Sequence, residues 1–285
     1  MICEVKALAC QLPRDLGLPF SRLSRETLRA AVIQRGIVAH ISGATIWRWL
    51  SADALRPWYH RSWIFPRDPL FSEKAGRVLD LYHRVWEDQP LRRDEYVVCA
   101  DECTGIQVKR RLHPTVPPQP GRAMRVEHEY QRKGTLAYLA AWDVHEAQVF
   151  GRIESRATIV AFDALVAQLM EREPYRSAAR IFLVVDNGTI HRGQRAVDRL
   201  RAQWPHLVLV HLPLHASWLD QVEIYFSILK RQVLTPNDFP SREIAATSIL
   251  GFQNRYQQIA KPFKWQFTRH DLNRLLARLT DQRAA

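Results

Sequence analysis

The fold of this chain is decided by the stretch Ile181-Phe182-Leu183-Val184-Val185-Asp186, five apolar residues that stop at a carboxylate. A continuous apolar run of this length predicts a strand buried on both faces, as in a parallel sheet. A second such run, Tyr96-Val97-Val98-Cys99-Ala100, stops at Asp101. Because ligands of α/β proteins bind at the carboxyl ends of parallel strands, the two runs predict two acids at one edge of a sheet.

A third acid, Glu223, lies in the stretch Ser217–Phe226, which is predicted to be helical. Carboxylate oxygens are the ligands that hard divalent cations prefer. Two such ions, about 3.5–4 Å apart, can clamp both the entering and the leaving oxygen of a phosphodiester displacement. We therefore expect Asp101, Asp186 and Glu223 to be catalytic and to bind two Mg²⁺ or Mn²⁺ ions. Each acid alone would also fit an ordinary turn or an exposed helix surface.

The overall charge of the chain points to a polyanionic partner. Lys plus Arg number 41 against 29 Asp plus Glu, so the formal net charge is +12. Such a balance favours nucleic acid over an anionic membrane. No apolar run approaches the ~18 residues that a membrane span needs, and the four cysteines lack the spacing of a zinc site. We expect a cytoplasmic protein, associated with the nucleoid if the source is bacterial.

Residues 1–56 read as an all-helical DNA-binding region. Ser24 is predicted to cap a helix that runs to Arg35, and Ser42 to precede a second helix over 43–50. Two short helices with a tight link resemble a helix-turn-helix, whose second helix enters the major groove. Thr45 and Arg48 would then face DNA. An ordinary helical hairpin with solvated side chains is the alternative.

Residues 57–92 are expected to form a linker and a helix. The linker contains Trp58, Tyr59, Trp63 and Phe65, which are too apolar to stay fully solvated, so we expect it to be ordered. The helix is predicted over 72–87.

Residues 107–133 are predicted to be a long, strongly basic loop. Loops of this length are usually functional or disordered. Concentrated positive charge beside a carboxylate site favours contact with DNA phosphates over simple solvation. The residues expected to bind DNA here are Lys109, Arg110, Arg111, Arg122 and Arg125.

The remaining pattern predicts an α/β domain over 93–285. An antiparallel hairpin is expected from strands 135–143 and 148–153. Buried strands and amphipathic helices then alternate, which favours a mixed sheet with helices on its faces. The elements expected after the hairpin are a helix at 157–173, a strand at 181–185, a helix at 192–204, a strand at 207–212, and helices at 217–231, 241–260 and 268–279.

Three blocks resemble those of bacterial insertion-sequence transposases of the mariner-like DDE superfamily. They are Cys99-Ala100-Asp101-Glu102, Leu183 through His191, and His215 through Glu223. The last block is similar to that family's signature of proline or alanine, serine, an apolar residue, asparagine, two further residues and glutamate.

The resemblance implies a ribonuclease-H-like catalytic domain at 93–285, a mixed five-stranded sheet flanked by helices, preceded by the helix-turn-helix. It implies cleavage of double-stranded DNA at terminal inverted repeats and strand transfer of the freed 3′-hydroxyl into target DNA. It also implies a homodimer on DNA, and the triad Asp101, Asp186 and Glu223 as metal ligands.

Two residues depart from that pattern. Asp220 stands where relatives carry asparagine, and Cys103 stands where many carry lysine. Relatives often carry a further DNA-binding helical unit upstream, so we also expect a shortened N-terminus. These departures keep two alternatives open: a catalytically impaired DNA-binding regulator, and a ribonuclease H or integrase-type nuclease.

The sequence also predicts the positions or roles of several residues near the triad. Asp220 and Asn187 are possible accessory residues of the site. Glu102 should face away from Asp101, because successive residues of a strand point to opposite faces. His191 is expected to be a surface histidine.

Overall fold

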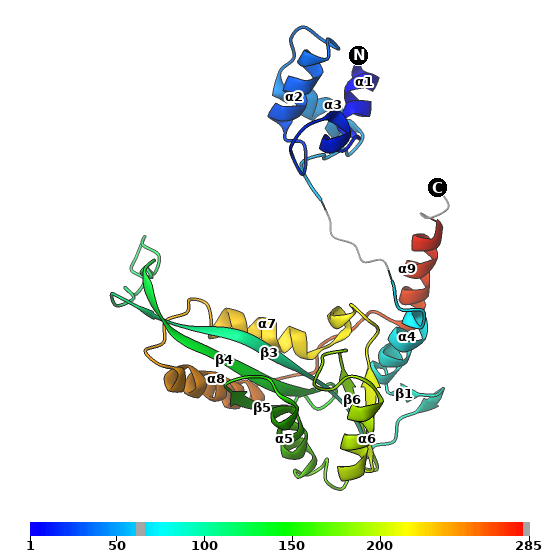
Figure 1. The fold of residues 1–285 in the computed structure, drawn as a ribbon, viewed down its shortest axis with the longest axis vertical. Helices are drawn as coiled ribbons and strands as arrows, with labels where there is room; N and C mark the ends of the chain where they lie inside the picture. Colours follow the sequence, from blue (N-terminus) through cyan, green and yellow to red (C-terminus); the bar gives the residue numbers. More distant parts are fainter. Residues whose placement is uncertain (61–65, 282–285) are drawn as a thin grey trace. The chain divides into compact units, whose positions relative to one another are not determined.

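The computed structural model describes residues 1–60 and 66–281, which form two compact units, Met1–Ile64 and Phe65–Ala285 (Figure 1). The prediction that the linker is ordered around Trp63 and Phe65 falls on residues outside those that the structure describes. None of the helices in the described parts of the chain has the length and apolarity that crossing a bilayer requires.

The first unit is helical. It consists of α1 (Ile2–Ala9), a 3-10 turn η1 (Pro13–Leu16), α2 (Arg25–Gln34) and α3 (Gly43–Ala52). The Ser24 Oγ accepts from the Thr27 N–H at 3.1 Å, and the Thr27 hydroxyl accepts in return from the Ser24 N–H at 2.7 Å. This reciprocal cap fixes the start of α2 where the sequence predicts it. The helices enclose a small core of Val5, Leu28, Ile46 and Leu50, all fully buried.

The second unit is built on one five-stranded sheet in the order β5-β4-β3-β6-β7. Strand β4 is antiparallel to β3 and β5, whereas β6 and β7 run parallel to β3. The ribonuclease-H-like mixed sheet expected from the sequence is therefore confirmed. The strands are β3 (Glu95–Arg111), β4 (Tyr130–Asp143), β5 (Val149–Glu154), β6 (Arg180–Val185) and β7 (Leu207–His211).

Helices cover both faces of the sheet, with one apolar core on each face. Alternation along β3 divides its side chains, because Val97 and Cys99 enter one core while Val98 and Ala100 enter the other. The first core contains residues of α4 (Phe71–Tyr82), α7 (Val222–Gln232), α8 (Arg242–Gln257) and α9 (Arg269–Asp281). The second contains residues of α5 (Ile159–Met170) and α6 (Gly193–Gln203).

The prediction of a loop over 107–133 is wrong. Strand β3 continues to Arg111 and pairs with β4, with Gln107 opposite Thr135 and Arg111 opposite Tyr130. Two further bridges, Val116 with Arg125 and Gln119 with Arg122, extend the pairing. Figure 1 shows this hairpin, here called the arm (residues 104–135), extending beyond the helices. Most of its side chains are exposed, so the sequence lacks the apolar alternation by which strands are recognised.

Two helix boundaries also differ from expectation. Helix α4 ends at Tyr82, and the chain then forms a small hairpin of β1 (Val85–Trp86) and β2 (Gln89–Pro90). The expected helix from Ser217 starts as a 3-10 turn η2 (Ser217–Leu219), and α7 begins only at Val222. Of the two residues between them, Asp220 has an extended backbone, which separates the two helical segments.

Gly151 of β5 marks a close approach between the sheet and α8. A Cβ at this position would lie 2.6 Å from the Gln253 Oε1 and would collide with the Tyr138 hydroxyl. Both of these groups are buried and hydrogen-bonded to each other at 2.9 Å, so neither can move freely. We therefore expect Gly151→Ala to lower the free energy of unfolding by about 1–3 kcal/mol, measured by urea denaturation.

Gly251 provides the matched control, because it lies in α8 with open space around its Cα. Gly251→Ala should raise stability by up to about 1 kcal/mol, since alanine favours a helix interior. Equal effects of the two substitutions would contradict the packing inferred at Gly151.

Candidate functional site

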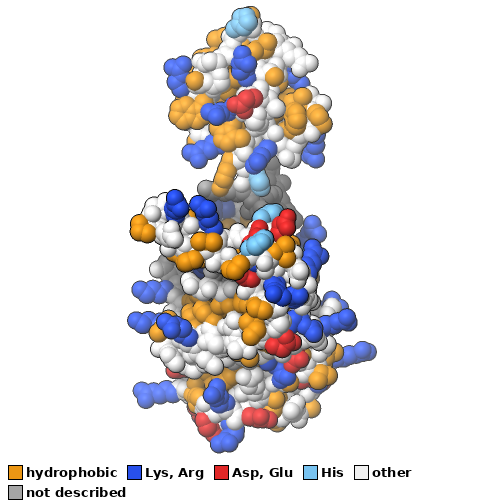
Figure 2. All heavy atoms as spheres, turned by 90° about the vertical axis from the view of Figure 1, so that its left-hand side faces the viewer, with side chains coloured by type: hydrophobic (Ala, Val, Ile, Leu, Met, Phe, Trp, Pro, Cys, Tyr) orange, Lys and Arg blue, Asp and Glu red, His pale blue; other side chains and the backbone are white. Residues whose placement is uncertain are grey.

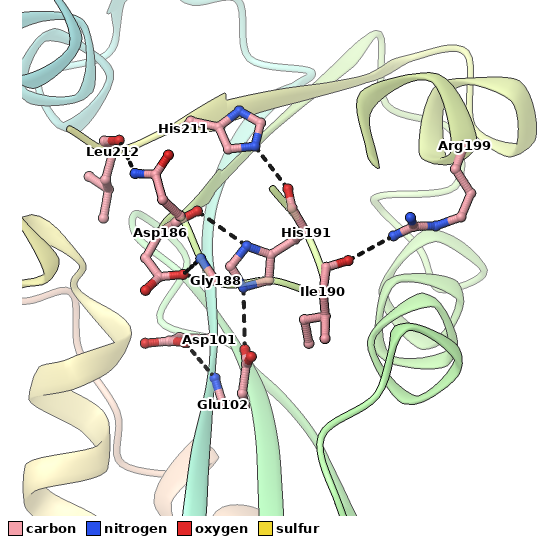
Figure 3. Close-up of polar contacts among 10 residues, drawn as sticks. Asp101, Glu102, Asp186, Gly188, Ile190, His191, Arg199, His211 and Leu212 are labelled. Atoms are coloured by element: carbon pink, nitrogen blue, oxygen red, sulfur yellow. Dashed lines mark hydrogen bonds and ion pairs between the residues drawn. The ribbon is translucent and has the colours of Figure 1, made fainter. Parts of the chain in front are cut away.

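Asp101 and Asp186 meet at the edge between β3 and β6. Asp101 belongs to β3, and Asp186 directly follows β6. These strands are parallel neighbours with Cys99 opposite Val184. Asp101 and Asp186 each lie two residues further along, so they reach the same level of the sheet. A carboxylate oxygen of each acid and a ring nitrogen of His191 all lie within 4.8 Å of one another (Figure 3).

The loop from Asp186 to His191 is fixed from several sides. The Gly188 N–H donates to the Asp186 Oδ1 at 2.6 Å, which forms a tight turn. The Asn187 amide donates to the Leu212 carbonyl at 2.7 Å, so its nitrogen holds the loop against the end of β7. The remaining bonds are made by His211 Nε2 to the His191 carbonyl at 2.8 Å and by Arg199 to the Ile190 carbonyl at 3.1 Å (Figure 3).

His191 is completely buried, so the expectation of a surface histidine is wrong. Its ring packs against Phe162 of α5, with 4.9 Å between ring centroids. Its Nδ1 lies 3.2 Å from the Asp186 carbonyl oxygen, which can only accept, so Nδ1 carries a hydrogen. Its Nε2 lies 3.4 Å from both the Asp186 Oδ1 and the Glu102 Oε2. The sequence feature that indicates this burial is the short spacing between Asp186 and His191, because a tight turn after Asp186 brings the two residues into contact.

Asp220 is buried under the site. Its Oδ1 accepts from the Val222 N–H at 3.0 Å, but its Oδ2 has no hydrogen-bond partner among the described residues. Burial raises the pKa of Asp220 well above its ordinary value, and the charges of Glu223 and Asp186 raise it further. A negative charge at Asp220 is thus opposed by both its surroundings and its neighbours.

The same crowding acts on Asp101. Burial, followed by the nearby charge of Asp220, raises the pKa of Asp101 to about 9. Glu102 and Asp186 add smaller repulsive effects in the same direction. A divalent cation among these oxygens would reverse the balance, because an opposite charge nearby favours ionised carboxylates. The oxygen-rich donor set at Asp101 and Asp186 therefore fits a hard cation such as Mg²⁺ or Mn²⁺.

Glu223 lies in the first turn of α7 and is half-buried. Its charge raises the pKa of both Asp220 and Cys103, and Cys103 belongs to the core that contains α7. Asp101 belongs to the same side by alternation along β3. Glu223 is not one of the three residues whose ligand atoms cluster within 4.8 Å, so its share in a metal site stays a prediction.

Comparison with known proteins identifies the family. A family model described as DDE superfamily endonuclease matches residues 96–244, more than half of the chain and a span that contains all three acids. The chain belongs to the DDE superfamily endonucleases. Comparison with curated protein sequences gave no match.

Solved structures confirm the fold of this DDE superfamily endonuclease. It resembles the Mos1 transposase paired-end complex with left transposon end, with 14% identity and a TM-score of 0.53 over 92% of this chain and 72% of that chain. It also resembles the Mos1 mariner paired end complex with Mn, with 13% identity and a TM-score of 0.51 over 86% and 73% of the two chains.

The basic side chains of the arm differ in their contacts and in their exposure to solvent. Arg111 is engaged within the endonuclease itself, because its guanidinium donates to the carbonyls of Glu127 at 2.8 Å and Asn237 at 3.0 Å. The Lys109 ammonium lies 4.3 Å from the centre of the Tyr130 ring. Arg110, Arg122 and Arg125 are exposed. Figure 2 views the molecule from the arm's side and shows Lys and Arg distributed among apolar side chains there.

In the first unit, Arg48 is exposed and Thr45 half-buried on α3. Their side chains contact each other at 3.3 Å, whereas Ile46 and Leu50 enter the core. The two polar residues therefore lie on an outer face of α3, where a groove-binding helix needs them.

The buried carboxyl of Asp220 predicts a pH-dependent stability. Its pKa is raised on folding, so the unfolded chain releases this proton first, and stability falls as pH rises above the unfolded value near 4. Each tenfold change in its proton affinity is worth about 1.4 kcal/mol. Asp220→Asn should therefore melt at a higher temperature than the wild type at pH 8 in EDTA, with a difference that shrinks toward pH 4.

The matched control is Asp88→Asn, which changes an exposed acid of the same unit. Its melting temperature should follow the wild type at every pH. A wild type that is as stable as Asp220→Asn across the whole range would contradict the burial of a charge at this position.

Proposed function

We propose that this endonuclease is a transposase that cuts double-stranded DNA at transposon ends and joins the freed 3′-hydroxyl to target DNA. The observation that carries the proposal is the convergence of Asp101 and Asp186 across parallel strands in a chain of net charge +12. The family match and the similarity to transposase structures support it.

Within this proposal, Asp101, Asp186 and Glu223 hold two divalent ions, Mg²⁺ or Mn²⁺. Such ions, when bound, stabilise the charge that develops on the scissile phosphate and on the attacking oxygen. The chain contributes orientation, because the turn at Gly188 and the contacts from β7 and α6 fix the Asp186 loop. Glu223 would approach from the first turn of α7.

DNA binding is assigned to two surfaces. Exposed basic residues of the arm, with Lys109 on its tyrosine, would neutralise phosphates without reading sequence. The outer face of α3, with Thr45 and Arg48, would read the terminal inverted repeats. Pairing of two ends by a homodimer belongs to the same proposal.

One alternative has a specific observation in its favour. Asp220 is a buried acid where relatives carry asparagine, and its Oδ2 has no hydrogen-bond partner among the described residues. The charge of Asp220 also opposes ionisation of Asp101. A DNA-binding regulator with impaired catalysis is therefore the second candidate. Asp220→Asn decides between the two, because a variant that cuts DNA where the wild type only binds would select the regulator.

Loss of one site carboxylate should abolish catalysis. Asp186→Asn keeps the shape of the side chain but removes its charge, so we expect nicking of a plasmid carrying the element's ends to fall at least about 10³-fold in Mg²⁺ or Mn²⁺. Asp198→Asn, an exposed acid on the nearby α6, should retain activity. Nicking that survives Asp186→Asn would refute the site, and preferential cleavage of an RNA–DNA hybrid would select a ribonuclease H.

The arm should contribute electrostatically to DNA affinity. Arg122→Ala and Arg125→Ala should each weaken binding to any DNA sequence and lower the slope of log affinity against log salt by about 1. Fluorescence anisotropy at several salt concentrations measures this slope. Arg176→Ala, an exposed arginine outside the arm that pairs with Glu173, serves as the control. A slope unchanged in both arm variants would exclude these residues from the DNA interface.

A further inference from the structure

Two polar atoms beside the site face each other without hydrogen-bond partners among the described residues. They are the Oε2 of Glu102 and the Nε2 of His191, both shielded from solvent. The distance between them is 3.4 Å, and the two side chains are only 14% and 0% exposed. Buried polar atoms without a partner are uncommon in folded proteins, so this pair calls for a functional explanation.

The imidazole contacts Asp186 at two points. Its Nδ1 lies at the main-chain oxygen of Asp186, and its Nε2 lies 3.4 Å from the Asp186 Oδ1. Gly188 permits this fit, because a Cβ there would lie 2.9 Å from both the Asp186 Oδ1 and the His191 Cε1. The ring thus fills the space behind the Asp186 carboxylate.

Strand alternation explains why Glu102 can reach this ring. Asp101 points to the face covered by α7, so Glu102 points to the face covered by α5 and α6. His191 lies on that second face, against Phe162 of α5. The carbonyl of His191 is also held by His211 of β7. The imidazole is therefore anchored in the fold and can transmit a fixed orientation to Asp186.

We propose that Glu102 and His191 form a positioning pair that holds the Asp186 carboxylate in its metal-binding orientation. The inference rests on the proposed function, since it assumes that Asp186 binds a divalent cation. Groups that orient a metal-binding side chain typically change metal affinity about 10- to 100-fold when they are removed. Neither residue has to touch the cation or the DNA for this effect.

Mn²⁺ affinity tests the pair directly, measured on the full-length protein by electron paramagnetic resonance of free Mn²⁺. His191→Asn places an amide near the Nδ1 position but leaves the Nε2 position empty. Glu102→Asp keeps the charge but withdraws it from the ring. Each should weaken Mn²⁺ binding about 10-fold or more. The double variant should be no weaker than the worse single variant, because residues that act as a unit are not additive.

A rescue variant and a control variant distinguish a positioning role of His191 from a purely structural one. His191→Gln, whose longer amide reaches toward the Nε2 position, should recover part of the Mn²⁺ affinity that His191→Asn loses. His206→Gln alters a histidine outside the site whose buried Nε2 likewise has no hydrogen-bond partner in the described parts of the chain, and it should leave Mn²⁺ affinity unchanged. Losses of affinity that merely follow the melting temperature in EDTA would overturn the proposal, as would unchanged affinity or additive effects.

Asp186→Asn distinguishes failure of this inference from failure of the proposed function. If Asp186→Asn binds Mn²⁺ as tightly as the wild type, the proposed metal site itself is wrong. If Asp186→Asn loses Mn²⁺ while the Glu102 and His191 variants retain it, the metal site stands and only the positioning pair is excluded.

Discussion

The parallel pairing of β3 with β6 is the interaction on which the rest of the site depends. It brings Asp101 and Asp186 to one level of the sheet, although their charges repel. The apolar residues that precede each acid are buried in two cores, one on each face of the sheet. Hydrophobic burial along the strands thus offsets the electrostatic repulsion around Asp101 and Asp186.

Three neighbouring acids contribute to the electrostatic repulsion at Asp101. Asp220, Glu102 and Asp186 all oppose the ionisation of Asp101, and burial opposes it more. A protein gains nothing in stability from such an arrangement, which is why crowded, perturbed carboxylates point to function. In the proposed function a divalent cation would resolve this conflict, and the strongly basic remainder of the chain would attract DNA phosphates.

The two faces of β3 carry different residues of the site. On the α7 face lie Asp101 and the buried Asp220, with Glu223 in the first turn of α7. On the α5 and α6 face, His191 and Glu102 support the loop that carries Asp186. One strand can serve both faces only because successive side chains alternate.

The sequence by itself determined the buried strands, their order within an α/β unit, the cap at Ser24 and the acid that follows β6. Each follows from a local pattern, namely apolar continuity, capping chemistry or the residue at which a strand stops. The prediction that a strand also stops at Asp101 is wrong, because β3 continues to Arg111. The basic arm was recognisable by its charge. Its strand character was not, because exposed pairing leaves no apolar alternation in the sequence.

Only the tertiary structure decided the surroundings of those acids. The burial of His191, its contact with Glu102 and the burial of Asp220 arise where segments distant in the chain pack together. A histidine after a turn is equally compatible with the surface and the interior until α5 places Phe162 beside it. Local patterns specify elements, whereas the depth and partners of a polar side chain depend on how those elements pack.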